Sequence, residues 1–97
     1  MTAYVIFDVR PTDPDAMKAY SEKAFDTLKP YDVKIVARTG NIDIREGNWQ
    51  PNRILILEFS SMEEARAWYD SPEYQKILPI RLGASEDNMV IVEGVSS

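Results

Sequence analysis

The side chains with which this 97-residue chain could carry out chemistry are carboxylates, arginines and aromatic groups, because it contains neither cysteine nor histidine. Without an imidazole or a thiol, the chain lacks the commonest general base, the usual zinc and haem ligands and a cysteine nucleophile. We therefore expect no metal site, no cofactor and no disulfide. Acid–base chemistry would have to come from aspartate or glutamate.

Two carboxylates, Glu58 and Asp8, lie within runs that otherwise have the pattern of β-strands. Glu58 belongs to the run RILILEF at 53–59, and Asp8 belongs to YVIFDVR at 4–10. Alternation along the strands places Arg38 on the same sheet face, within reach of both. The group is either a buried salt-bridge network, in which pairing offsets desolvation, or a site where arginine tunes Glu58 to act as a general acid or base.

Aromatic residues and arginines gather between residues 48 and 81. Trp49 lies in a loop, where it serves either as a lid over a pocket or as a contact with a partner subunit. Arg53 and Arg81 are of the type that binds carboxylates, although a surface or capping role explains them as well. For Trp68 and Tyr69 the competing interpretation is packing beneath the sheet. The candidate binding residues are Trp49, Arg53, Arg38, Trp68, Tyr69, Tyr74 and Arg81.

The elements that position these residues follow from hydrophobic spacing and from helix-capping residues. Strands are expected at 4–10, 33–38, 53–59 and 89–93, where β-branched and aromatic residues dominate. Helices are expected to begin at Asp13, at Ser60 or Ser61, and at Ser71. Pro30 should end the first helix, and Pro79 should interrupt or kink a short third one.

This order of elements predicts a ferredoxin-like βαββαβ fold of the α+β class. Such a fold has a four-stranded antiparallel sheet with its helices on one face. A chain of 97 residues is too short to support two hydrophobic cores, so we expect one domain spanning residues 1–97.

Strand alternation separates the sheet into a face under the helices and an open face. The residues expected under the helices are almost all apolar: Val5, Phe7, Val9, Ile35, Ala37, Leu55, Leu57, Phe59, Val90 and Val92. The residues expected on the open face are half apolar and half charged: Tyr4, Ile6, Asp8, Arg10, Lys34, Val36, Arg38, Ile54, Ile56, Glu58, Met89, Ile91 and Glu93. A monomer would leave these apolar side chains in water, so we predict that the open face pairs with a second copy and encloses a barrel.

Composition also limits the partners. The net charge of −5 and the pI of about 4.6 oppose binding to a phosphate backbone, so no nucleic acid is expected. No apolar stretch approaches the roughly 18 residues of a membrane helix, and no signal sequence is apparent. We expect a cytoplasmic protein whose partners are a second copy of itself and a small molecule, with no membrane association.

A longer pattern in the second half of the chain resembles a known family. W-x-P-x-R from Trp49, E-F at Glu58, and A-R-A-W-Y-x-S-P-E-Y ending at Tyr74 are similar to the domain of unknown function 1330 family. The opening AYVIFDVRPTDPDAMKAY and the closing VIVEGV are similar to its ends. The resemblance implies a dimeric α/β barrel. That superfamily also contains cofactor-independent monooxygenases, lactone isomerases and haem-dependent peroxidases, so membership does not select a chemistry.

Three functions therefore remain open. The first is a homodimer that binds a small carboxylate or aromatic molecule in a pocket near Trp49, Arg53, Trp68, Tyr74 and Arg81. The second is a cofactor-independent isomerase, lyase or monooxygenase in which Glu58 or Asp8 moves protons. The third is a structural dimerisation domain without a ligand.

Overall fold

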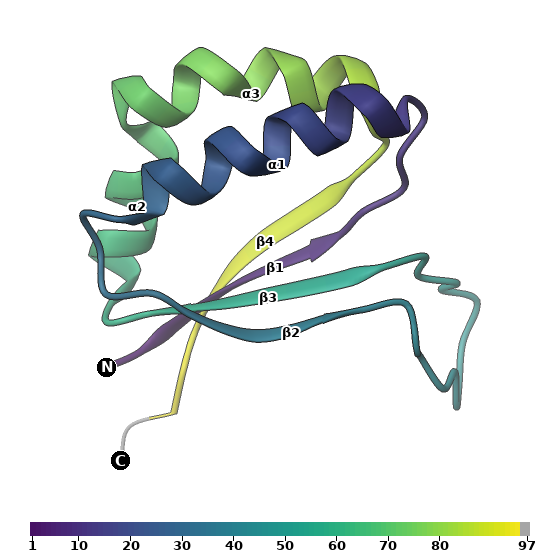
Figure 1. Ribbon diagram of the computed structural model, residues 1–97. Helices are drawn as coiled ribbons and strands as arrows, with labels where there is room; N and C mark the ends of the chain where they lie inside the picture. The colour runs from purple at the N-terminus through teal and green to yellow at the C-terminus, as the bar shows by residue number, and fades with distance from the viewer. Residues whose placement is uncertain (96–97) are drawn as a thin grey trace.

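The computed structural model describes residues 1–95 and has a four-stranded antiparallel sheet with three helices packed on one face (Figure 1). The strands are β1 (Ala3–Asp8), β2 (Lys34–Thr39), β3 (Ile54–Phe59) and β4 (Asn88–Glu93), in the spatial order β2-β3-β1-β4. The helices are α1 (Pro14–Leu28), α2 (Met62–Asp70) and α3 (Pro72–Ala84). The predicted ferredoxin-like α+β fold is confirmed, and β1 lies beside β3 in the sheet.

Each helix begins at a polar residue whose side chain satisfies a free backbone N–H. Asp13, Ser61 and Ser71 accept hydrogen bonds from the backbone N–H three residues further on, at 3.2, 3.1 and 3.2 Å. The first turn of a helix has N–H groups without intrahelical partners, so these caps fix where each helix starts.

Pro79 does not interrupt α3, contrary to the expectation of a short third helix. The helix continues through it to Ala84. Pro79 is exposed, so water can hydrate the backbone carbonyl that proline leaves without a donor. The part of the helix after Pro79 includes Arg81, whose guanidinium lies over the ring of Phe7 on the sheet.

The hydrophobic core lies between the sheet and the helices. Its strand side chains include Val5, Phe7, Leu57 and Phe59, all buried. Helix α2 lies close to β1 and β4, whereas α1 packs along α3 (Figure 1). The ring of Trp68 packs against Phe59, with ring centroids 5.6 Å apart.

A β-bulge in β2 overturns the predicted position of Arg38. Ile35 pairs with Leu57 and Arg38 pairs with Leu55, with one extra residue accommodated between Ile35 and Ala37. A bulge shifts the alternation by one residue, so Arg38 joins Leu55 on the helix side. Ala37, expected under the helices, pairs with Ile56 instead.

The predicted faces of β4 are also reversed. Met89 pairs with Phe7 and Ile91 with Val5, so both lie under the helices and pack against the core. Val90 and Val92 belong to the open face and are 52% and 39% exposed. The four residues 89–92 are all apolar and show no alternation of polar and apolar side chains, so only the register with β1 determines which sheet face each side chain occupies.

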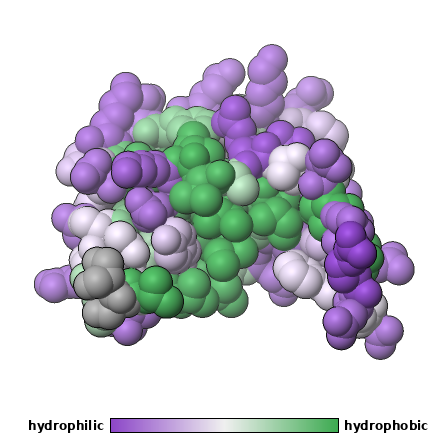
Figure 2. Space-filling model, turned by 90° about the horizontal axis from the view of Figure 1, so that it is seen from below, coloured by the Kyte–Doolittle hydropathy of each residue, from purple (hydrophilic) through white to green (hydrophobic). Residues whose placement is uncertain are grey.

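The open face of the sheet presents a broad apolar surface. Figure 2 looks onto this side and shows a continuous green band of hydrophobic side chains bordered by hydrophilic ones. The register assigns to this face Tyr4, Ile6, Ile54, Ile56, Val90 and Val92. Within residues 1–95, no helix is long and apolar enough to cross a membrane.

Candidate functional site

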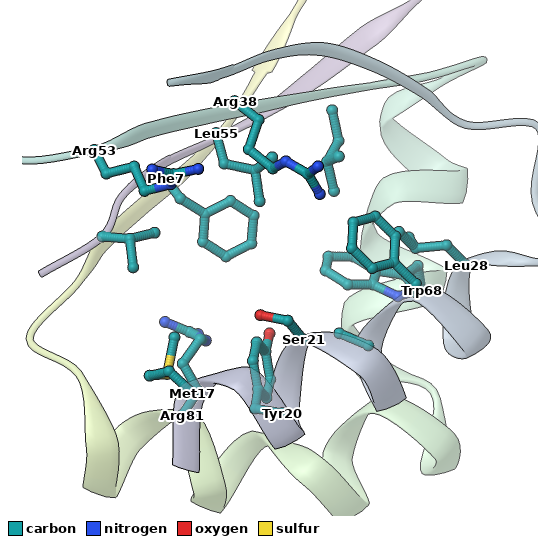
Figure 3. Close-up of a pocket in the computed structure, with 14 residues that line it drawn as sticks. Phe7, Met17, Tyr20, Ser21, Leu28, Arg38, Arg53, Leu55, Trp68 and Arg81 are labelled. Carbon is teal, nitrogen blue, oxygen red and sulfur yellow. The ribbon is translucent and has the colours of Figure 1, made fainter. Parts of the chain in front are cut away.

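A cavity of about 130 Å³ opens between α1 and the helix side of the sheet. Figure 3 shows strand residues along one side of it and residues of all three helices along the other. Most of its wall is aliphatic or aromatic. The lining residues are Phe7, Val9, Met17, Tyr20, Ser21, Ala24, Phe25, Leu28, Arg38, Arg53, Leu55, Leu57, Trp68 and Arg81.

Two arginines enter the cavity from the sheet. Arg38 comes from β2, and Arg53 directly precedes β3 (Figure 3). The Arg38 guanidinium lies over the ring of Phe25, 5.6 Å from its centroid. Within residues 1–95 neither arginine forms an ion pair, and both residues are exposed. They place two uncompensated positive charges at the solvent side of an apolar cavity.

The helix side of the cavity has a connected set of buried polar groups. Arg81 donates from Nε to the Tyr74 hydroxyl at 3.2 Å and from Nη1 to Asp87 Oδ2 at 3.0 Å. The Tyr74 hydroxyl lies 2.6 Å from the hydroxyl of Tyr20, a residue that lines the cavity. Asp87 also accepts from the backbone N–H of Arg10 at 3.1 Å. The buried Arg81, which itself lines the cavity, is thus linked through the Tyr74 hydroxyl to the hydroxyl of Tyr20.

The charge states of this set follow from its surroundings. Burial disfavours the cation at Arg81, but the neighbouring Tyr74 oxygen and the hydrogen bond to Asp87 outweigh it, so the pKa of Arg81 is raised above its ordinary value. Burial raises the pKa of Tyr20 strongly, and its contact with Tyr74 adds to the effect. Arg81 is therefore always charged, and Tyr20 is always protonated, at accessible pH.

The two predicted catalytic carboxylates do not reach this cavity. Asp8 and Glu58 lie on the open face, opposite Ile54 and Tyr4 respectively. Arg38 lies on the helix side, so the predicted cluster of Asp8, Arg38 and Glu58 is wrong. The bulge in β2 is the physical reason, because it turns Arg38 away from the two carboxylates.

Asp8 anchors the loop between β2 and β3. Its Oδ2 accepts from the Trp49 indole N–H at 2.9 Å, and its Oδ1 accepts from the backbone N–H of Asn52 at 3.0 Å. Burial raises its pKa, but these two bonds and the nearby Arg10 charge prevail, so the pKa of Asp8 is lowered overall. Trp49 therefore holds a loop in place and does not line the cavity.

Glu58 has a polar environment of its own on the open face. Its Oε1 accepts from the Tyr4 hydroxyl at 3.2 Å, and its Oε2 lies 4.0 Å from Lys34 Nζ. No carboxylate is among the residues that line the cavity. In the described part of the chain, 1–95, no group of three or more carboxylates is placed to hold a metal ion.

Four of the seven predicted binding residues line the cavity: Arg53, Arg38, Trp68 and Arg81. Tyr74 stands directly behind the wall through its bond to Tyr20. Tyr69 packs against the rings of Trp68 and Tyr74 and is not part of the lining. Three lining residues on α1 were missed: Tyr20, Ser21 and Phe25. The helical spacing of this stretch is also typical of packing in the core. The hydroxyl groups of Tyr20 and Ser21 were the one sequence feature that could have indicated a polar site here.

The fold resembles several solved structures at low sequence identity. The RPA0582 protein of unknown function from Rhodopseudomonas palustris matches with a TM-score of 0.73 and 16% identity, over 99% of this chain and 84% of that one. A dimeric ferredoxin-like protein of unknown function from Jannaschia sp. CCS1 matches with a TM-score of 0.67 and 15% identity, over 97% and 100%.

An enzyme is among the similar structures. SnoaB, a cofactor-independent oxygenase from Streptomyces nogalater, matches with a TM-score of 0.61 and 12% identity, over 99% of this chain and 93% of SnoaB. Identities this low show a common fold and carry no residue roles. No curated protein sequence matches the chain significantly.

The family is identified over nearly the full length. Residues 2–95 match the family model described as "Domain of unknown function (DUF1330)". The pattern from Trp49 to Tyr74 lies within that match, and the fold is similar to that of dimeric ferredoxin-like proteins. The chain therefore belongs to the DUF1330 family.

Proposed function

We propose that this protein is a homodimer that binds a small aromatic carboxylate in the cavity between α1 and the sheet. One observation carries the proposal: Arg38 and Arg53, neither paired with a carboxylate within residues 1–95, lie at the solvent side of an otherwise apolar cavity. A site with apolar walls and a few convergent polar groups is the usual form of a small-molecule site.

The size of the cavity favours a single ring. A cavity of roughly 150 Å³ lined by apolar side chains takes up benzene, and this one measures about 130 Å³ with an opening to solvent. The aromatic residues Phe7, Phe25 and Trp68 form part of the wall. A ring can therefore lie inside while a charged substituent stays at the opening.

The charge at the opening favours an anion. The chain has a net charge of −5, so a general attraction for anions is not expected from the molecule as a whole. Guanidinium groups match the geometry of a carboxylate and bind it by charge-assisted hydrogen bonds. Local attraction by Arg38 and Arg53 would thus select one anionic group within an acidic protein.

An enzymatic role with a strand carboxylate as the base has less support. Glu58 and Asp8 lie on the sheet face opposite the cavity, and both already accept hydrogen bonds from other side chains. Any proton transfer inside the cavity would have to use hydroxyl groups. The likeness to SnoaB is one of fold, and we therefore place binding ahead of catalysis.

Dimer formation through the open face is supported by the surface of the single chain. Its accessible area is 6521 Å², whereas a compact monomer of this mass is expected to expose roughly 5,700 Å². The excess is close to the roughly 800 Å² that one partner buries in a stable interface. The exposed valines of β4 lie on this face, and similar structures from Jannaschia and Bacteroides fragilis are described as dimeric. We propose that the whole chain acts as one such barrel-forming domain.

The ligand proposal is tested with benzoate as the probe, by isothermal titration calorimetry. We expect Arg38→Gln and Arg53→Gln each to weaken benzoate binding by about tenfold, the value of one charge-assisted hydrogen bond. Arg66→Gln is the matched control, because Arg66 is an exposed arginine on α2 that does not line the cavity. Benzoate that fails to bind the unchanged protein at millimolar concentration, or equal affinity in all four proteins, would contradict the proposal.

A further inference from the structure

The hydrogen bonds behind the cavity wall fix which way each phenol donates. Arg81 is a donor only, so its Nε–H must donate to the Tyr74 oxygen, 3.2 Å away. Tyr74 is 0% exposed, and within residues 1–95 its hydroxyl has one other hydrogen-bond partner, the Tyr20 hydroxyl at 2.6 Å. The proton of Tyr74 therefore goes to Tyr20.

The opposite arrangement is unfavourable. If Tyr20 donated to Tyr74, the Tyr74 oxygen would accept two hydrogen bonds while its own buried proton had no acceptor. An unpaired buried donor loses its hydration without replacement. Arg81, Tyr74 and Tyr20 thus form a chain in which each group donates to the next, and such chains strengthen along their length.

This direction leaves the Tyr20 proton without a partner among the described residues. Tyr20 lines the cavity, and in Figure 3 its hydroxyl points from α1 toward the space in front of the strand residues. The raised pKa of Tyr20 keeps the proton in place. The inner wall therefore presents the Tyr20 hydroxyl as a hydrogen-bond donor to whatever occupies the cavity.

We propose that Tyr20 donates a hydrogen bond to a carbonyl oxygen of the ligand, which is accordingly an aromatic oxo acid with its carboxylate at Arg38 and Arg53. The inference rests on the proposed function and specifies its ligand further. Two polar ends with a ring between them match a cavity with charge at its opening, apolar walls, and a donor at its inner side.

The polar group of the ligand that faces Tyr20 should be neutral, because the inner wall has no uncompensated charge. Arg81 is paired with Asp87 at 3.0 Å, and both side chains are buried, so a second carboxylate would find no free cation there. A neutral acceptor loses less hydration than an anion on entering such a place. The structure therefore favours a monocarboxylate over a dicarboxylate.

Two compounds of nearly equal shape test the inference, 4-acetylbenzoate and 4-isopropylbenzoate, since only the first has a carbonyl group. We expect Tyr20→Phe to reduce the affinity ratio of the acetyl to the isopropyl compound by about fivefold, as for one neutral hydrogen bond. Ser21→Ala is the matched control, because Ser21 is the adjacent hydroxyl on the cavity wall. Calorimetry on the intact protein measures both ligands.

The outcomes separate this inference from the proposed function. If both compounds bind and Arg38→Gln weakens both, but Tyr20→Phe leaves their ratio unchanged, Tyr20 is not the donor and carboxylate binding stands. If the ratio of the two affinities falls in Ser21→Ala and not in Tyr20→Phe, the donor is Ser21 and the proposal for Tyr20 is wrong. Absence of binding by either compound would overturn both ideas. Should Tyr20→Phe not fold, the Cζ resonance of labelled Tyr20 must shift with 4-acetylbenzoate and not with 4-isopropylbenzoate.

Discussion

Arg81 is the side chain on which the buried polar contacts converge. It bonds to Asp87 and to Tyr74, and it lies over the Phe7 ring with its guanidinium carbon 5.5 Å from the centroid. A buried ion pair is costly to break because the remaining charge stays in a medium of low polarity. Arg81 thus ties the end of α3 to the segment before β4 and also directs the hydroxyl groups of the cavity wall.

The lowered pKa of Asp8 predicts a dependence of stability on pH. A carboxylate whose pKa is lower in the folded protein contributes stability above its unfolded pKa, near 3.8, and that stability is lost as the pH falls through the folded value. We expect the free energy of unfolding, measured with urea, to fall more between pH 5 and pH 3 for the natural protein than for Asp8→Asn. Parallel pH profiles for the two proteins would show that the bonds from Trp49 and Asn52 are not coupled to folding.

At the residue scale, the sequence identified the cavity arginines but not their arrangement. Arg53, Arg81 and Trp68 were predicted from residue type alone, since guanidinium and indole groups are common in binding sites. Tyr20 was not among the predicted site residues, because a tyrosine at helical spacing has the same pattern whether it packs or binds. Its orientation depends on Tyr74 and Arg81, which are far away in the chain.

At the scale of secondary-structure elements, Ser71 joins α2 to α3. Its hydroxyl accepts from the Tyr74 N–H at 3.2 Å and donates to the Trp68 carbonyl at 2.7 Å. It therefore ends α2 and begins α3 with one side chain. The rings of Trp68 and Tyr74, on either side of it in the chain, lie with their centroids 4.3 Å apart.

We expect Ser71→Ala to lower the free energy of unfolding by about 1 to 2 kcal/mol, as for the loss of an N-cap. Urea denaturation monitored by circular dichroism measures the change. Ser71→Asp, which retains an acceptor for the first turn of α3, should recover most of the loss. Equal stability of Ser71→Ala and the natural protein would mean that packing alone positions the two helices.

The elements themselves were largely predictable. The sheet face toward which the side chains of β2 and β4 point was not. Helix starts follow from local chemistry at Asp13, Ser61 and Ser71, which is visible in a few adjacent residues. The bulge in β2 and the facing of β4 arise from pairing with β3 and β1. Such pairing depends on distant residues, and neither Val36 nor the apolar run 89–92 identifies it locally.

At the scale of the whole molecule, the chain is a thin slab with Cα extents of 33 × 30 × 16 Å. One side of the sheet is covered by helices and the other is open (Figures 1 and 2). A second sheet packed face to face would give the molecule the second layer that it lacks. The cavity lies on the other side of the sheet, so the proposed dimer contacts and the proposed ligand contacts would use alternate residues of the same strands.

Val90→Lys tests the proposed interface. We expect the natural protein to sediment as a dimer at micromolar concentration, and Val90→Lys to raise the dissociation constant by about a hundredfold or more, because each interface would bury two lysines without partners. Sedimentation velocity measures both. Leu82→Lys is the control, since Leu82 is 65% exposed on α3 and lies on the helix side. A monomeric natural protein, or a dimer dissociated equally by both substitutions, would refute an interface on the open face.

The two tryptophans differ in environment in a way that gives the molecule its own optical reporters. Trp68 is 1% exposed and lines the cavity, whereas Trp49 is 60% exposed on the loop between β2 and β3. Trp68 should therefore fluoresce at shorter wavelength and resist quenching by iodide, while Trp49 should emit at longer wavelength and be quenched readily. In a Trp49→Phe background, the remaining emission comes from an indole in the cavity wall, so occupancy of the cavity can be followed without attaching a dye.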